Sequence, residues 1–191
     1  HMYAESNDGL EWRFPSLGLV TDPTGTTSNN IFLKLNNTRH EYSNVMYTPH
    51  LESARRYTLL AYRSGNHHIR FSKDGLEWKD WSCEPVIHHF GDVGFYMYDS
   101  HDKLFRGMIK RFLEVRGRRR RIQNWTVSED GYEWTLPQPA ILPDEKDDEW
   151  TDGDLNRATE IYGIPIFRYG PVLLGFADLL RATNAMGTLG V

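Results

Sequence analysis

The sequence has little that would cross-link it covalently or place it in a membrane. Its 191 residues include a single cysteine, Cys83, so an internal disulfide bond is excluded. No run of about 18 apolar residues occurs, which predicts that no helix spans a membrane. We recognise no signal peptide, and His1-Met2 is typical of a cloning remnant, so the sequence leaves the compartment open. The formal net charge of −4 gives no bulk attraction to nucleic acid, and we expect no nucleic-acid partner.

Long helical periodicity is also missing, whereas aromatic residues are plentiful. They make up 13% of the chain, with 6 tryptophans and 10 tyrosines. An aromatic-rich and turn-rich chain without helical periodicity favours an all-β fold. One pattern, Ser-x-Asp-Gly-[Leu/Tyr]-Glu-Trp, occurs three times: at Ser6–Trp12, Ser72–Trp78 and Ser128–Trp134.

Each copy of this motif predicts a strand, a tight turn and a second strand. Asp-Gly is the strongest short hairpin signal, because a type I′ turn needs positive φ at both central residues. The tryptophan that follows can cover the hairpin with a large apolar face. The aspartates Asp8, Asp74 and Asp130 are 66 and 56 residues apart. Propeller blades of four strands repeat at roughly 40–50 residues, so the spacing predicts blades lengthened by loop insertions. The alternative is a chance recurrence of Asp-Gly hairpins.

We therefore predict an all-β, β-propeller-like fold with about three four-stranded blades in one partial domain, residues 1–191. The third unit lacks its own motif, and we expect the N-terminal hairpin to complete it. Three blades fall short of the usual number of about 4–8 in a ring. We therefore predict a homo-oligomer, most simply a two-fold dimer with six units. The expected strands cover residues 31–35, 44–47, 57–62, 68–71, 93–98, 104–110, 120–127, 158–167 and 172–176.

A carboxylate precedes the expected first strand of each unit: Glu41, Asp92 and Glu160. The first strands of propeller blades line a central channel, so we expect these side chains to converge. Convergent carboxylates in an aromatic-lined pocket favour glycoside hydrolysis, in which one acid protonates the leaving oxygen and another acts as base or nucleophile. The alternative for each carboxylate by itself is a solvated loop acid.

Several segments together resemble the five-bladed β-propeller glycoside hydrolases of the family 32 and 43 group. They are the three motifs, Leu17-Gly18-Leu19 before Asn29-Asn30-Ile31, Tyr57 to Arg63, and Pro143-Asp144 through Glu160-Ile161-Tyr162. The resemblance covers most of the chain and implies Glu160 as the general acid and Asp92 as the supporting aspartate. For the base or nucleophile it leaves Glu41, with Asp22 as a substitute.

Six further residues are candidates for contact with a sugar. Tyrosine faces would stack on sugar rings, and the histidines near the first inner strand would hydrogen-bond to hydroxyl groups. The candidate substrate-binding residues are His40, His50, Asn30, Tyr98, Arg119 and Tyr162. The pairs His67-His68 and His88-His89 lack the spacing of a zinc site, and we interpret them as structural. We expect no metal in the site and no cofactor, and the sequence leaves a structural calcium ion open.

Two charged stretches have a structural interpretation and a functional one. Arg116 to Arg121 is interpreted as a hairpin with structural ion pairs, and the alternatives are substrate contacts or phosphate binding. Asp144 to Asp154 is interpreted as a solvated acidic loop, because it lacks the ligand spacing of an EF-hand.

Three functions follow from this sequence. The first is a glycoside hydrolase that cleaves pentosyl or furanosyl linkages, such as arabinofuranosides or xylosides. It requires two carboxyl groups about 5–5.5 Å apart for retention or about 6.5–9.5 Å apart for inversion. The second is a carbohydrate-binding propeller without catalysis, or a truncated or degenerate enzyme, which needs aromatic faces but no such pair. The third is a scaffold for protein interaction with an exposed apolar or charged rim.

Overall fold

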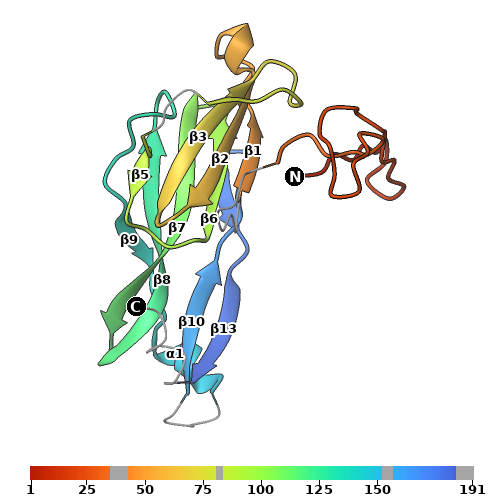
Figure 1. Cartoon of the computed structure of the whole chain (residues 1–191). Helices are drawn as coiled ribbons and strands as arrows, with labels where there is room; N and C mark the ends of the chain where they lie inside the picture. Colours follow the sequence, from red (N-terminus) through yellow and green to blue (C-terminus); the bar gives the residue numbers. More distant parts are fainter. Residues whose placement is uncertain (35–42, 81–83, 152–156, 184–191) are drawn as a thin grey trace.

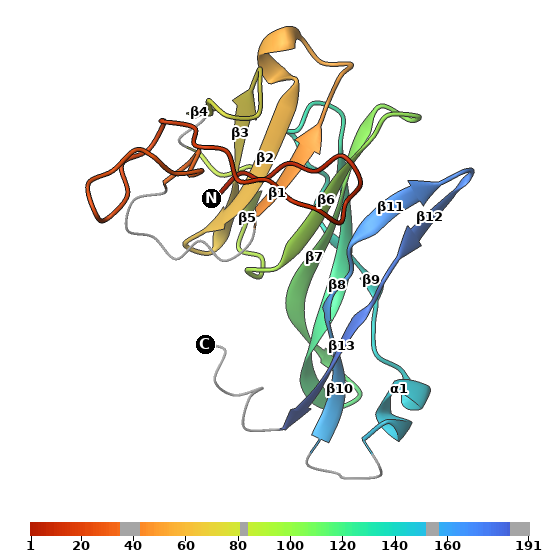
Figure 2. The ribbon, with the colours of Figure 1, turned by 90° about the vertical axis from the view of Figure 1, so that its right-hand side faces the viewer.

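The computed structural model describes residues 1–34, 43–80, 84–151 and 157–183. In this part of the chain nearly all regular structure is β, and twisted sheets follow one another along the sequence as blades do (Figures 1 and 2). The predicted all-β, propeller-like fold is therefore confirmed. We call the three successive sheets units one, two and three, and residues 1–34 the N-terminal arm.

Unit one contains β1 (Ser43–Tyr47), β2 (Tyr57–Arg63), β3 (Asn66–Ser72), β4 (Lys79–Asp80) and β5 (Ile87–His88). The first four strands pair in sequence order and are antiparallel, and β5 pairs with β3. A short 3-10 helix, η1 (Ser53–Arg55), precedes β2. Ser64 and Gly65 join β2 to β3 with φ angles of 49° and 87°, as a type I′ turn requires.

Unit two is a four-stranded antiparallel sheet of β6 (Gly94–Asp99), β7 (Leu104–Val115), β8 (Arg118–Ser128) and β9 (Gln138–Ile141), in that order. β7 and β8 stay in register from the pair Val115–Arg118 to the pair Phe105–Ser128. Arg116 and Gly117 close this long hairpin with φ angles of 55° and 73°. The hairpin predicted at the arginine run is therefore confirmed.

Unit three is one long, interrupted hairpin formed by β10 (Arg157–Gly163), β11 (Ile166–Tyr169), β12 (Val172–Gly175) and β13 (Asp178–Thr183). β10 pairs with β13, and β11 pairs with β12. Residues 157–183 thus form two strand paths. Strands were predicted at residues 158–167 and 172–176, and β13 extends the second path to Thr183. β10 runs beside β8 (Figure 1). The Arg118 side chain donates a hydrogen bond to the Arg157 carbonyl at 2.5 Å. Gln123 donates one to the Ile161 carbonyl at 3.0 Å.

The N-terminal arm lies beside unit one (Figure 1). The Phe32 ring lies 6.3 Å from the Trp78 ring, between centroids. Inside the arm, isolated bridges join Met2 to Ile31 and Glu5 to Arg13. Neither β13 nor β12 pairs with any residue of the arm. The prediction that the N-terminal hairpin completes the third unit is therefore wrong within a single chain. Of the strand expected at residues 31–35, the described residues 31–34 show only a bridge at Ile31.

The three motif turns differ from the type I′ turns that the sequence predicts. In each turn only the glycine has positive φ: 78° at Gly9, 80° at Gly75 and 84° at Gly131. The Asp74 carboxylate accepts hydrogen bonds from the amides of Leu76 at 3.0 Å and Glu77 at 2.9 Å. The turns are therefore wider and closed by side chains, because aspartate and serine satisfy backbone donors that a tight hairpin would pair across the strands.

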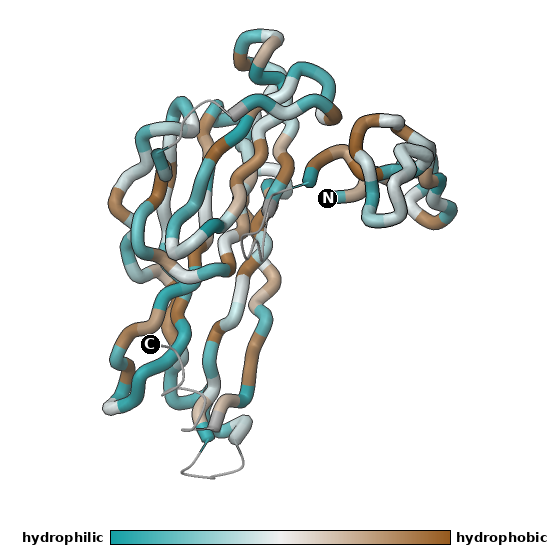
Figure 3. The backbone as a smooth tube through the Cα atoms, viewed as in Figure 1, coloured by the Kyte–Doolittle hydropathy of each residue, from teal (hydrophilic) through white to brown (hydrophobic). Residues whose placement is uncertain are grey.

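The main hydrophobic core lies between units one and two. Figure 3 shows hydrophobic and hydrophilic residues alternating along their strands. Trp134, from the third motif, packs against this core, with its ring 5.5 Å from the Tyr96 ring. The role expected for the motif tryptophan is thus confirmed at Trp134. The buried members of the core are Met46, Leu60, Ile69, Phe71, Ile87, Phe90, Tyr96, Phe105 and Ile109.

The acidic stretch after unit two forms a short helix, α1 (Glu145–Glu149), and not only the loop that was expected. Asp144 caps its start by accepting hydrogen bonds from the amides of Lys146 and Asp147 at 2.8 and 3.2 Å. Asp148 forms an ion pair with the buried Arg120, at 2.6 Å. The helix forms because a capping box and a buried arginine use carboxylates that the sequence suggested were only solvated.

Candidate functional site

Five side chains from units two and three meet in a charged group that we call the interblade cluster: Asp92, Lys110, Arg121, Glu160 and Tyr162. Asp92 lies two residues before the start of β6, Lys110 lies on β7, Arg121 on β8, and the other two on β10. Three of the five were predicted as site residues from the sequence. β10 brings Glu160 and Tyr162 to the cluster together because residues two apart in a strand share a face.

The outer end of the cluster is an ion pair between Asp92 and Lys110. The Lys110 side chain is only 5% exposed, and that of Asp92 is 27% exposed. Gly91 holds the backbone next to Asp92 close to β7, because its amide donates a hydrogen bond to the Lys110 carbonyl at 2.9 Å. A Cβ atom on Gly91 would lie 2.6 Å from the Lys110 carbonyl oxygen, so only glycine allows this contact. The backbone thus places the Asp92 carboxylate against a nearly buried ammonium group.

The inner end is an ion pair between Arg121 and Glu160, whose side chains are 15% and 2% exposed. A charge-assisted contact of this kind is shorter and stronger than a hydrogen bond between neutral groups. Glu160 lies in the middle of β10, although the sequence predicted a carboxylate that precedes the first strand. Its partner is on β8, the third strand of unit two, so the pair lies between two units.

Tyr162 connects the two ends. The Lys110 ammonium lies 4.4 Å from the centroid of the Tyr162 ring, and the Arg121 guanidinium lies 5.7 Å from it. Cations over an aromatic face are attracted by its quadrupole. One aromatic ring, two cations and two carboxylates therefore form a continuous set of contacts with balanced charge.

His67 supports this arrangement from unit one. It is 1% exposed; its Nε2 lies 2.9 Å from the Gly91 carbonyl, and its Nδ1 lies 2.9 Å from the Tyr96 hydroxyl. The carbonyl can only accept, so Nε2 carries the proton and Nδ1 accepts from the tyrosine. Burial lowers the pKa of His67 to about 4. The predicted structural role of His67 is thus confirmed, and its contact holds the residue before Asp92.

Other predicted residues lie outside the interblade cluster. His50 and Tyr98 are neighbours, with ring centroids 6.4 Å apart. Tyr98 is near the end of β6, at the opposite end of this strand from Asp92. The Arg119 guanidinium lies 4.9 Å from the Phe112 ring centroid, and the same ring contacts Arg121 at 4.8 Å.

Two predicted residues belong to the N-terminal arm. Asn30 donates a hydrogen bond to the Tyr3 carbonyl at 2.6 Å, which holds the arm together. Asp22 closes a turn by accepting bonds from the Thr24 hydroxyl at 2.7 Å and the Thr24 amide at 2.9 Å. The Thr24 hydroxyl bond is the main cause of a lowered pKa at Asp22. Glu41 and His40 lie outside the described residues.

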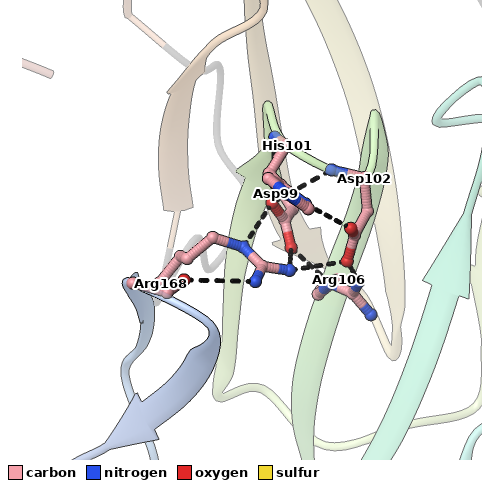
Figure 4. Close-up of polar contacts among 6 residues, drawn as sticks. Asp99, His101, Asp102, Arg106 and Arg168 are labelled. Carbon is pink, nitrogen blue, oxygen red and sulfur yellow. Dashed lines mark hydrogen bonds and ion pairs between the residues drawn. The ribbon is translucent and has the colours of Figure 1, made fainter.

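A second charged group fastens unit three to unit two (Figure 4). Asp99, at the end of β6, accepts hydrogen bonds from Arg168 Nε at 2.8 Å and from Arg106 Nε at 2.9 Å. Arg168 also contacts Asp102 at 2.5 Å, and His101 lies 2.7 Å from the same aspartate. The Asp99 side chain is fully buried. Because Arg168 comes from β11, these contacts hold the hairpin of unit three in place.

The arginine run is accounted for by ion pairs and backbone contacts, as its structural interpretation predicted. Arg120 makes two contacts with Asp148, at 2.6 and 2.9 Å, and Arg121 pairs with Glu160. Arg118 bonds a carbonyl of β10. The sequence did not single out Lys110, whose only signal was a lysine in a strand of apolar residues.

Among the described residues, no group of three or more histidine, cysteine, aspartate or glutamate side chains is arranged to hold a metal ion. No helix in the described ranges is long and apolar enough to cross a membrane. A surface hollow beside the second motif contains none of the predicted site residues; its lining is Ala54, Phe71, Ser72, Lys73, Glu77 and Lys79.

No protein-family model matches the sequence, and no curated protein matches it. Solved structures do match the fold. One is a glycoside hydrolase, with a TM-score of 0.50 and 16% identity over 76% of this chain and 46% of the other. Another is an N-acetylgalactosamine deacetylase from F. plautii, in complex with blood group B trisaccharide. It has a TM-score of 0.53 and 13% identity over 95% of this chain and 54% of its own. The chain thus spans about half the length of these proteins and shares their fold.

Proposed function

We infer that this chain is a carbohydrate-processing propeller module, and specifically a glycoside hydrolase acting on pentosyl or furanosyl linkages. The observation that carries the proposal is the interblade cluster. It unites the predicted acid, Glu160, the predicted supporting carboxylate, Asp92, and a tyrosine face, Tyr162. The fold shared with two proteins named for carbohydrate chemistry supports the same class.

In this proposal Glu160 protonates the leaving oxygen and Asp92 sets the charge around it. Asp92 is the more exposed carboxylate, so the sugar approaches from its side and stacks on Tyr162. Glu160 is covered by Arg121, and a bound sugar has to draw the guanidinium away before the acid can act. Catalytic contacts of this kind commonly form only in the substrate complex. In this proposal the base or nucleophile is Glu41.

One observation favours a second function, a carbohydrate-binding propeller without catalysis. Both cluster carboxylates are engaged by cations, and Glu160 is 2% exposed. A general acid has to be protonated at the working pH, whereas a binding site needs only ring faces and hydrogen bonds. Binding without turnover is the result that this second function predicts.

A panel of chromogenic aryl arabinofuranosides and xylosides, combined with calorimetric titration of the unmodified sugars, tests the two functions together. The first function predicts turnover that Asp92→Asn lowers strongly and Glu129→Gln, an exposed control, leaves unchanged. Sugar binding without turnover supports the second function. Neither binding nor turnover on the panel would contradict both.

A further inference from the structure

Within the described residues, two parts of this chain each hold only part of a blade. Units one and two continue from a second strand to a third, and the motif turn follows that third strand. In unit three, β13 pairs only with β10 and β12 only with β11 within residues 157–183. In the N-terminal arm, Ser6–Trp12 forms the motif turn, and in the described part of the chain this turn does not follow a strand of a sheet.

The turn in the arm is fully formed even so. The Ser6 hydroxyl accepts a hydrogen bond from the Gly9 amide at 2.8 Å, and the Asp8 carboxylate accepts one from the Glu11 amide at 2.9 Å. The corresponding bonds in the second motif are 2.8 and 2.9 Å long. In the third motif they are 2.9 and 2.9 Å long. The arm is therefore preformed as the outer turn of a blade.

What the arm lacks is a sheet for its tryptophan. Trp134 packs on the core between units one and two, whereas Trp12 is 54% exposed. Hydrophobic residues on the arm are visible in Figure 3. The large exposed apolar side chains of the arm are Met2, Leu10, Trp12, Phe14 and Leu19.

Unit three shows the complementary surface. Its β11–β12 hairpin carries large apolar side chains that are more than a third exposed, with Phe167 and Phe176 stacked at 5.7 Å. Exposed apolar residues gathered on an edge that is open to pairing form an association surface, which soluble proteins normally cover. On the hairpin these residues are Phe167, Tyr169, Val172, Leu173 and Leu174, and Phe176 and Leu179 follow it in unit three.

The position of the arm shows how the arm of one copy can reach unit three of another copy. In the described residues, Phe32 seats the arm against Trp78 of unit one, and Arg168 seats unit three against Asp99 of unit two. The arm and unit three therefore flank the two complete units. A blade finished by the arm of another copy would continue directly into unit one of that copy.

We propose that two copies of this chain exchange their N-terminal arms, so that each arm provides the outer strands and motif turn of unit three in the other copy. The exchange follows a two-fold axis, closes on itself and yields a six-unit ring. It pairs the outer edge of β13 and covers the apolar hairpin of unit three. This assembly goes beyond the proposed function and does not depend on it.

Light scattering on a sizing column, at micromolar concentration, is the first test. The proposal predicts twice the chain mass of 22.3 kDa. Trp12→Glu in the arm and Phe176→Glu in unit three should each give monomers that retain the wild-type circular dichroism. Leu136→Glu changes an exposed leucine of unit two, 73% exposed, and should leave the dimer intact.

Mixing the two disruptive variants gives the decisive result. Trp12→Glu keeps an intact unit three, and Phe176→Glu keeps an intact arm, so the mixture should recover heterodimers held by one intact contact. An interface formed by any other surface would not be restored by mixing. A wild-type monomer, or dimers that persist in both variants, would overturn the proposal. A variant that loses its β-sheet spectrum is replaced by Leu10→Glu or Leu174→Glu, and the same outcomes apply.

Discussion

At the residue scale, the buried carboxylate of Asp99 forms ion pairs with two arginines. The carboxylate contacts Arg168 at 2.5 Å and Arg106 at 2.9 Å, and the Arg168 hydrogen bond is the main cause of its lowered pKa. Asp99→Asn leaves two arginines without their common partner, and we expect it to cost about 3–5 kcal/mol of unfolding free energy. Asp102→Asn, whose side chain is 34% exposed, should cost clearly less. Urea unfolding measures both, and equal losses would contradict this ranking.

His67 predicts a pH dependence with a definite sign. Its pKa is about 4 in the folded protein against 6.5 when unfolded, because burial disfavours the charged ring. The unfolded chain therefore takes up the proton first, so stability falls as the pH drops from 6.5 towards 4. Over that window the loss is about 3 kcal/mol.

A variant isolates this contribution from the carboxylates. His67→Gln keeps a donor for the Gly91 carbonyl and an acceptor for Tyr96 but cannot titrate. The difference in unfolding free energy between wild type and this variant should shrink as the pH falls from 6.5 to 4. A difference that stays constant over this range would show that His67 does not titrate as described.

At the element scale, the motif turns give a matched pair of substitutions. Gly75 and Gly131 both have positive φ, so alanine costs about 1–2 kcal/mol at either position. At Gly131 the new Cβ would also lie 2.9 Å from Ile69 Cδ1, which adds about 1–3 kcal/mol of overpacking. At Gly75 its nearest atoms are 3.7 Å away. Thermal unfolding should therefore rank Gly131→Ala below Gly75→Ala, and the reverse order would refute this packing.

The strands of units one and two were predictable from sequence because aromatic and β-branched runs ended at turn residues. The type of turn at the Asp-Gly sites was not predictable. The positive-φ pairs are at Ser64-Gly65 and Arg116-Gly117, and the Asp-Gly sites adopt a turn closed by serine and aspartate side chains. Propensity for positive φ does not reveal which local hydrogen bonds will form. The helix α1 was missed although its capping box, Asp144 with Asp147, is a local pattern, because the stretch was interpreted from its acidic composition alone. Its ion pair with Arg120 depends on a three-dimensional neighbour.

At the scale of the whole molecule, the sequence located three of the five residues of the interblade cluster. Asp92, Glu160 and Tyr162 were predicted from strand starts, aromatic content and a family resemblance. Lys110 and Arg121 were not predicted as site residues, because Lys110 meets Asp92 only when β6 and β7 pair, and Arg121 meets Glu160 only when β10 lies beside β8. No sequence spacing specifies that contact between units. Asp22 and Asn30 were predicted as site residues but lie in the N-terminal arm beside unit one, and the sequence did not reveal where the arm lies.

The central claim is that Glu160 acts as the general acid of this cluster. A general acid matters when the leaving group is a strong base and matters little when the leaving group is already acidic. Hydrolysis of unsubstituted phenyl glycosides by Glu160→Gln, compared with dinitrophenyl glycosides of the same sugar, therefore separates catalysis from structural damage. The account predicts at least about a hundredfold loss on the phenyl substrate and little loss on the dinitrophenyl substrate. Unchanged turnover on the phenyl substrate, or equal losses on both, would contradict it.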